Sequence, residues 1–370
     1  MLTPKEEEFY AEFKRLKSES GNHSPSVFKL LKSFPEVSIK IDACFLCNPY
    51  AFNIFFSEFS QADLENYVKF YPPQNHEVAE NIAAFRGLPA DRILVGNGAI
   101  ELIEHFVRGK RAVFPLPTFS SYYEQLEGKS YMHPYELKPE NDFALDIDDF
   151  IKHIKSANPN LVILVNPNNP TGTLVSREDV IRLHQALRKD QRLIVDESFI
   201  DFATDESVEQ YSLSYNNIII IRSLSKDFGI AGLRLGYAVL PPGMVNDCLK
   251  SGFLWNSNGI AYYFTELLAD AAFQKRYTKA KKDYNNARDD FYQELISLGL
   301  DVIPSQANFF MVRTPEDPGL YFSKLLYTHG IYTRILNDKW GLEGNWIRIA
   351  SKDRKENRQM LHAIRKIWKG

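Results

Sequence analysis

Short apolar runs recur between residues 92 and 240, and amphipathic stretches separate them. The runs are continuous rather than alternating, which is typical of strands covered on both faces of an α/β sheet. Six segments have this pattern: Ile93–Val95, Ala112–Phe114, Leu161–Val165, Leu193–Val195, Ile218–Ile221 and Leu235–Leu240. Between two of them, Ser176–Asp179 predicts a capping box that opens a helix. The pattern predicts a layered α/β domain with a mostly parallel sheet.

The pattern changes after about residue 253. Mostly helical sequence over residues 262–298 is followed by strand-like and helical segments in alternation, namely Asn308–Val312, Gly319–Thr328, Trp346–Ile349 and Lys355–Trp368. A chain of 370 residues is long enough for two domains. We expect a large α/β/α three-layer domain over residues 46–271. Residues 1–45 with 272–370 are expected to form a smaller α+β domain, with the N-terminal segment folding back over it.

Composition narrows the class of protein. The chain is 44% hydrophobic and 25% charged with a net charge of −3, as in ordinary globular proteins. It has no clustered basic excess, so a nucleic-acid partner is not expected. Its aliphatic runs are too short to span a membrane, and residues 1–17 lack the apolar core of a signal peptide. We therefore expect a cytoplasmic location.

The three cysteines are too few for a disulfide framework. Cys44 and Cys47 form a C-x-x-C pair, but no second pair or histidine spacing completes a zinc site. We interpret both as buried core cysteines and expect no metal.

The strongest chemical signal is the segment R-S-L-S-K-D-F-G-I-A-G-L-R-L-G-Y, which begins at Arg222. It places Lys226 just beyond a buried strand, at the carboxyl edge where open α/β sheets bind ligands. The hydroxyls of Ser223 and Ser225 precede this lysine, and Arg234 follows it. An amine, hydroxyls and a guanidinium suit a phosphorylated aldehyde. The alternative is a surface lysine in a polar turn, which leaves the flanking G-L-R-L-G unexplained.

Two further motifs follow predicted strands. In V-G-N-G-A-I-E, Gly98 ends a turn before a helix, so the amides of Ala99 and Ile100 can bind a phosphate. In V-D-E-S-F, Asp196 ends a buried strand, where a carboxylate is costly unless it is paired. The alternative for Asp196 is a helix N-cap.

With these blocks in order, the chain resembles the class I/II (fold type I) aminotransferase superfamily, whose cofactor-lysine signature is the S-x-S-K…R-x-G block. The resemblance implies pyridoxal 5′-phosphate (PLP) bound to Lys226 as a Schiff base. Asp196 keeps the pyridine nitrogen protonated, which lets the ring accept electrons. Asn169, in N-P-N-N-P-T-G, donates to the phenolic oxygen of the ring. Phe119, in P-T-F-S-S-Y, stacks on the ring, with an ordinary core phenylalanine as the alternative.

The resemblance also implies a homodimer in which Tyr71, in Y-P-P-Q, contacts the cofactor phosphate of the partner subunit. Arg348, in W-I-R-I-A, is implied to bind the carboxylate or phosphate of a small-molecule substrate, because a planar guanidinium binds such groups in a bidentate manner. Asn169 is a further substrate contact. Arg334 is a second anion ligand, with a surface arginine as the alternative.

One residue departs from the family pattern. Phe199 stands where family aminotransferases commonly have a tyrosine whose hydroxyl also bonds the phenolic oxygen. With one donor fewer, we predict a higher pKa for the Lys226 imine than in tyrosine-bearing relatives.

The nearest groups are histidinol-phosphate aminotransferases and threonine-phosphate decarboxylases. Phe119, Phe199, the G-N-G-A-I-E block and the spacing of Arg334 and Arg348 favour the decarboxylases, but they do not decide which bond at Cα breaks. We expect an aminotransferase that uses an amino acid or amino-phosphate and a 2-oxo acid, because transamination is the commonest reaction of the superfamily. A PLP-dependent threonine-phosphate decarboxylase is the alternative. A PLP-binding regulator is a third possibility, disfavoured because the first 40 residues are too short for an added DNA-binding domain.

Overall fold

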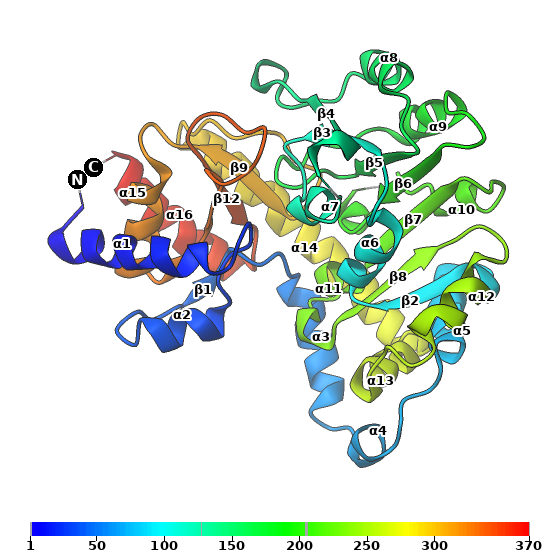
Figure 1. Ribbon diagram of the computed structural model, residues 1–370. Coiled ribbons are helices and arrows are strands. Elements are labelled where there is room, and N and C mark those ends of the chain that lie inside the picture. The colour runs from blue at the N-terminus through cyan, green and yellow to red at the C-terminus, as the bar shows by residue number, and fades with distance from the viewer. Residues whose placement is uncertain (1, 127, 204–205, 370) are drawn as a thin grey trace.

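The computed structural model describes residues 2–126, 128–203 and 206–369, which form a large and a small lobe (Figure 1). A seven-stranded sheet of order β2-β8-β7-β6-β5-β3-β4 lies at the centre of the large lobe. Its strands are β2 (Ile93–Asn97), β3 (Ala112–Leu116), β4 (Met132–Glu136), β5 (Leu161–Val165), β6 (Arg192–Asp196), β7 (Ile218–Ser223) and β8 (Leu235–Val239). Strand β8 runs antiparallel to both of its neighbours, and the other pairs are parallel. The predicted mostly parallel sheet is confirmed.

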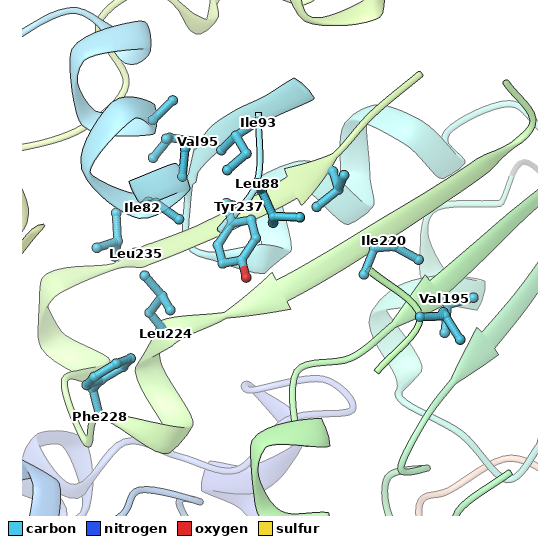
Figure 2. Packing of buried hydrophobic residues seen from close by; sticks show 14 of the residues in the cluster. Ile82, Leu88, Ile93, Val95, Val195, Ile220, Leu224, Phe228, Leu235 and Tyr237 are labelled. Atoms are coloured by element: carbon cyan, nitrogen blue, oxygen red, sulfur yellow. The ribbon is translucent and has the colours of Figure 1, made fainter. Parts of the chain in front are cut away.

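Helices cover both faces of this sheet, because alternate residues of the continuous apolar strands face opposite sides. Val95, Val195 and Ile220 pack under α3, α5, α8, α9 and α13 (Figure 2), whereas Leu94 and Ile194 pack against α6, α7 and α12. Burying each such side chain contributes about 1.5–3 kcal/mol. The helices of this lobe are α3 (Pro49–Phe59), α4 (Glu65–Lys69), α5 (Asn75–Arg86), α6 (Ala99–Val107), α7 (Ser120–Glu124), α8 (Ile147–Ala157), α9 (Arg177–Gln185), α10 (Glu209–Ser212), α11 (Leu224–Asp227), α12 (Met244–Cys248) and α13 (Gly259–Leu267).

The predicted capping box of α9 is only half formed among the described residues: the Ser176 side chain accepts a hydrogen bond from the Asp179 amide at 3.2 Å, without the reciprocal bond to the Asp179 side chain. Strand β4 was not predicted. Its sequence contains Pro134 and its residues are only partly buried or exposed, as suits the edge position that it occupies.

The small lobe combines an antiparallel sheet of order β11-β12-β9 with the parallel pair β1-β10. Helix α1 packs on α15, where the Phe13 and Phe322 rings lie 4.3 Å apart, so the N-terminal segment does fold back over this lobe (Figure 1). The domain limits at residues 45–46 and 271–272 stay a prediction. The elements are α1 (Pro4–Ser18), α2 (Val27–Ser33), β1 (Ile41–Asp42), α14 (Ala271–Ser297), β9 (Phe309–Arg313), α15 (Pro318–Ser323), β10 (Ile331–Tyr332), β11 (Arg334–Ile335), β12 (Trp346–Ala350) and α16 (Arg354–Lys369).

Candidate active site

A cavity of about 240 Å³ lies at the carboxyl ends of the parallel strands, where the small lobe meets the sheet. The structure brings most of the predicted site residues to its wall. They are Ala99, Ile100, Phe119, Asn169, Asp196, Ser223, Ser225, Lys226, Arg234, Arg334 and Arg348. These residues come from separate loops and from both lobes, so the fold assembles a site that no single segment contains.

Lys226 lies on α11, the short helix that follows β7, and its side chain lines the cavity. The Asn48 amide donates to the Lys226 carbonyl at 2.9 Å, which ties this helix to the start of α3. Burial, together with the positive charges of Arg348 and Arg234, lowers the pKa of the Lys226 amine below its ordinary value. A lowered pKa makes the amine a better nucleophile near neutral pH, as imine formation requires.

Asp196 ends β6 and is only 3% exposed. One carboxylate oxygen accepts the hydroxyl hydrogen of Tyr122 at 2.8 Å, and the other accepts the Ser198 amide at 2.9 Å. Burial raises the pKa of this carboxyl, and the two hydrogen bonds oppose that rise. A protonated ring nitrogen would give the buried carboxylate the positive partner that it needs. Tyr122 was missed by the sequence analysis, because only the fold brings α7 next to β6.

The turn before α6 lies close to Arg234 and Gly236, and we call the narrow space between them the cradle. A Cβ atom added at Gly98 would lie 2.5 Å from an Arg234 nitrogen, and one added at Gly236 would lie 2.6 Å from the Ala99 amide nitrogen. Nearby, the buried Ser225 hydroxyl has no hydrogen-bond partner within the described residues. Amides at a helix N-terminus, a guanidinium and an unpaired hydroxyl are the donors that a phosphate takes up. The residues therefore fit a phosphorylated pyridine aldehyde.

Two arginines occupy the small-lobe side of the cavity. Arg334 and Arg348 are direct partners across the antiparallel strands β11 and β12. Arg348 donates to the Asn169 side-chain oxygen at 2.6 Å and to the Cys44 carbonyl at 2.9 Å. Arg334 donates to the Asp338 carboxylate at 2.6 Å. Both guanidinium groups are buried, so the surface alternative for Arg334 is wrong.

Several cavity residues were not found from the sequence. Asn22 and His23 come from the loop between α1 and α2, and Lys339 comes from the loop between β11 and β12. No motif or strand end marks these loops, so the sequence offered no signal for them. Tyr71 lies outside this cavity and is 92% exposed. Its predicted contact with a partner subunit stays a prediction.

The cysteines behave partly as expected. Cys44 is buried, but Cys47 is partly exposed, which corrects the interpretation of both as core residues. Cys47 lies in the turn just before α3, where the chain passes between the lobes. Among the described residues, no group of His, Cys, Asp and Glu could hold a metal ion. The helices described include none with the length and apolarity to cross a membrane.

Comparison with known proteins finds relatives over the whole chain. The family model for aminotransferases of class I and II matches residues 56–364. An L-serine phosphate decarboxylase of Campylobacter jejuni is 37% identical, covering 100% of this chain and 99% of the relative. An L-serine phosphate decarboxylase of Sulfurospirillum multivorans is 38% identical, covering 98% of this chain and 97% of the relative. The solved structure of a decarboxylase from the same organism has a TM-score of 0.93 at 36% identity, covering 99% of this chain and 97% of that one.

These relatives correct the expected reaction. The prediction of an aminotransferase is wrong, because relatives that match the chain over its full length are decarboxylases. The roles predicted for Lys226 and Asp196 concern the cofactor and are common to both reactions, so these residues carried no information about the bond that breaks. That choice depends on how the substrate is held, which is set by residues outside the cofactor motifs.

Proposed function

Because this chain belongs to the family of class I and II aminotransferases, we propose, from its cavity and its full-length relatives, that it decarboxylates an O-phosphorylated amino acid. The substrate we assign is O-phospho-L-serine. The reaction breaks the bond between Cα and the carboxylate, releases carbon dioxide and yields O-phosphoethanolamine after a proton is added at Cα. The cofactor is PLP, as in the rest of the family.

The pair of buried arginines is the observation that carries this proposal. Arg334 and Arg348 face one cavity from paired strands, so the site supplies two planar cations for one small substrate. O-phosphoserine has two anionic groups, a carboxylate and a phosphate, that match them. Histidinol phosphate has only one anionic group, so it could occupy only one of the two arginines.

Some residues of the cavity are assigned to the cofactor and others to the substrate. Lys226 would hold PLP through its aldehyde carbon, and Asp196 would pair with the ring nitrogen. When bound, PLP supplies an electron sink for the electron pair that remains at Cα as carbon dioxide leaves. Arg348 and Asn169, already hydrogen bonded to each other, orient the amino acid beside the ring. The Lys226 amine would be the group that returns a proton to Cα.

The cofactor phosphate is assigned to the cradle at the start of α6. Ser223, Ser225, Arg234 and the amides of Ala99 and Ile100 would donate hydrogen bonds to the phosphate, with Gly98 leaving room for Arg234. Phe119 would stack on the ring. The cradle glycine and the unpaired Ser225 hydroxyl support this assignment.

The family is typically homodimeric. We assign Tyr71 to the cofactor phosphate of the partner subunit. In the single chain, Val68, Phe70 and Tyr71 are 75%, 61% and 92% exposed, an apolar surface of the kind that a second subunit covers.

The test incubates the PLP-loaded enzyme with O-phospho-L-serine, O-phospho-L-threonine, or histidinol phosphate plus 2-oxoglutarate. Carbon dioxide release is measured together with the phosphorus-31 NMR spectrum of the product. We expect carbon dioxide and O-phosphoethanolamine from phosphoserine, and no amino transfer from histidinol phosphate. Faster release from phosphothreonine would replace the assigned substrate, and amino transfer without gas release would overturn the proposed reaction.

Variants locate the second anion site. Arg334→Gln removes one cation, and losing a charged hydrogen-bonding partner costs about 1.5–3 kcal/mol, so kcat/KM for phosphoserine should fall about 10- to 150-fold. Arg313→Gln is the control, because Arg313 lies in the same sheet, on β9, but is exposed and paired with Asp301. An equal loss in both variants would contradict a substrate-binding role for Arg334.

A further inference from the structure

Lys339 is a buried lysine in the loop between β11 and β12, and it lines the active-site cavity at 8% exposure. Its loop is held against the large lobe. The ring of Trp340 lies 6.1 Å from that of Phe114 and 5.4 Å from that of Tyr123. Gly341 has φ +74° and lies so close to β3 that a Cβ atom there would be 2.7 Å from a Leu116 carbon. Lys339 is therefore held in position, unlike a surface lysine.

The amine of Lys339 lacks a counter-ion. Its only hydrogen bond within the described part of the chain is a long one of 3.5 Å to the Asn22 carbonyl, and it forms no salt bridge there. The two nearest acids are already engaged. Asp338 pairs with Arg334 at 2.6 Å and with Lys17 at 2.7 Å.

Glu124 is the other acid near this amine. It accepts the Asn22 side-chain amide at 2.6 Å, and its second oxygen lies 3.5 Å from a His23 ring nitrogen. The charges around Lys339 therefore come from β11 (Arg334), β12 (Arg348), its own loop (Asp338), α7 (Glu124) and the N-terminal segment (Lys17, His23). Arg334, Arg348 and Lys17 outnumber the two acids, Asp338 and Glu124, so the surroundings of the Lys339 amine carry a net positive charge.

These surroundings act on the protonation of the amine. Burial, followed by the charge of Arg334, lowers the pKa of Lys339 to about 7. The amine is therefore largely neutral in the free enzyme above that pH. A phosphate dianion beside it would supply the missing counter-ion and favour the ammonium form.

We propose that Lys339 is a specificity residue for the substrate phosphate, and that it takes up one proton from solvent when the phosphate dianion binds. The inference rests on the proposed function only in taking a phosphate monoester as the substrate. Recognition by Lys339 then depends on the charge of the bound group. A dianion favours protonation of the amine, whereas a neutral group leaves the amine unprotonated. Binding is then strongest between about pH 6, above which the phosphate is a dianion, and pH 7, above which free Lys339 loses its proton.

The test uses 3-phosphonooxypropanoate, which is O-phosphoserine without its amino group and so cannot react at Lys226. Its binding to the PLP-loaded enzyme is measured by calorimetry at pH 8 in buffers with different ionisation enthalpies, which gives the number of protons taken up. We expect about 0.9 proton in the wild type, and a Kd that rises up to about tenfold per pH unit above pH 7. No proton uptake in the wild type would overturn the inference.

Two substitutions separate charge from structure. Lys339→Arg carries a permanent charge, so it should bind without proton uptake and keep its affinity at pH 8. Lys339→Met should bind weakly at every pH, also without uptake, and it provides the measurement if the arginine variant does not fold. Proton uptake that persists in either variant would place the proton on another group, such as His23, and refute the assignment.

The matched control is Lys352→Met. Lys352 is 7% exposed and its amine likewise contacts only a backbone carbonyl, that of Phe45, but it does not line the cavity. It should show wild-type proton uptake, and a change there as large as at Lys339 would contradict the inference. The assay needs no turnover. Proton uptake without decarboxylation of phosphoserine would refute only the proposed reaction. Decarboxylation without proton uptake would refute only the inference about Lys339.

Discussion

The hydrogen bond from Tyr122 to Asp196 offers a sharp test of how the site keeps its carboxylate ionised. Both side chains are buried, at 0% and 3% exposure, and the oxygen atoms lie 2.8 Å apart. Substituting Tyr122 by Phe removes this donor and leaves the carboxylate with the hydrogen bonds of Ser198. Burial already raises the pKa of Asp196, so the loss pushes that pKa further upward.

The size of the shift follows from the energy of the lost bond. A hydrogen bond to a charged group contributes about 1.5–3 kcal/mol, and one pKa unit corresponds to about 1.4 kcal/mol. The pKa of Asp196 should therefore rise by about 1–2 units in Tyr122→Phe. Because Asp196 must be ionised to face a protonated ring nitrogen, the acid limb of the kcat profile should move to higher pH by a similar amount.

The assay measures kcat for decarboxylation between pH 5 and pH 9 together with the absorbance spectrum of the bound cofactor. Tyr123→Phe is the matched control, since Tyr123 lies next in α7 and its buried hydroxyl has no partner in the described chain. Its profile should follow the wild type. If the acid limbs of all three proteins coincide, the Tyr122 hydroxyl does not control the ionisation of Asp196 and the reasoning fails.

Three further outcomes follow from the same site. Lys226→Ala should give no pyridoxyl adduct on that side chain by mass spectrometry after borohydride treatment, and no turnover; retained turnover would refute the assigned lysine. Gly98→Ala places a Cβ atom 2.5 Å from the Arg234 guanidinium, at a residue whose φ is +75°. Equilibrium dialysis should therefore show cofactor binding weakened at least about tenfold. Unchanged binding would contradict the assignment of the cofactor phosphate to this turn. Phe199→Tyr adds a donor at the cavity wall and should lower the pKa of the Lys226 imine in a spectroscopic titration, with an unchanged titration as the contrary result.

The sheet could be predicted because burial on both faces leaves a simple pattern. Runs such as Leu161–Val165 and Ile218–Ile221 are continuous and β-branched, and both are buried strands. The positions of the residues proposed to bind the cofactor could be predicted for a related reason. Asp196, Asn169 and Lys226 each end or follow one of these strands, so finding the strand locates the side chain at the carboxyl edge.

The remaining residues have no such local pattern. Asn22 and Lys339 line one cavity although they are 317 positions apart in the chain. Their loops lack strand periodicity, and the contact arises only when α1 packs on the small lobe and the β11–β12 loop packs on Phe114. Tyr122 was missed because its partner, Asp196, lies 74 residues later on another element. Long-range packing of this kind is not encoded in the spacing of any one segment.

The same distinction explains why the cofactor motifs could not decide the reaction. PLP makes several bonds at Cα breakable, and the bond that breaks is the one held perpendicular to the ring. In the proposed site two groups would hold the substrate: Arg348, which is hydrogen bonded to Asn169, and Arg334 with Lys339 from the loop that follows β11. When the substrate phosphate is bound by Arg334 and Lys339, the substrate carboxylate can reach only positions close to Arg348. We therefore expect the distance between the two anion sites to decide which bond at Cα breaks. Arg348→Lys moves the cation of one site, so it should reduce decarboxylation and allow amino transfer as a measurable side reaction. If Arg348→Lys slows decarboxylation at least tenfold with no accumulation of the pyridoxamine form, the anion sites bind the substrate without choosing the bond.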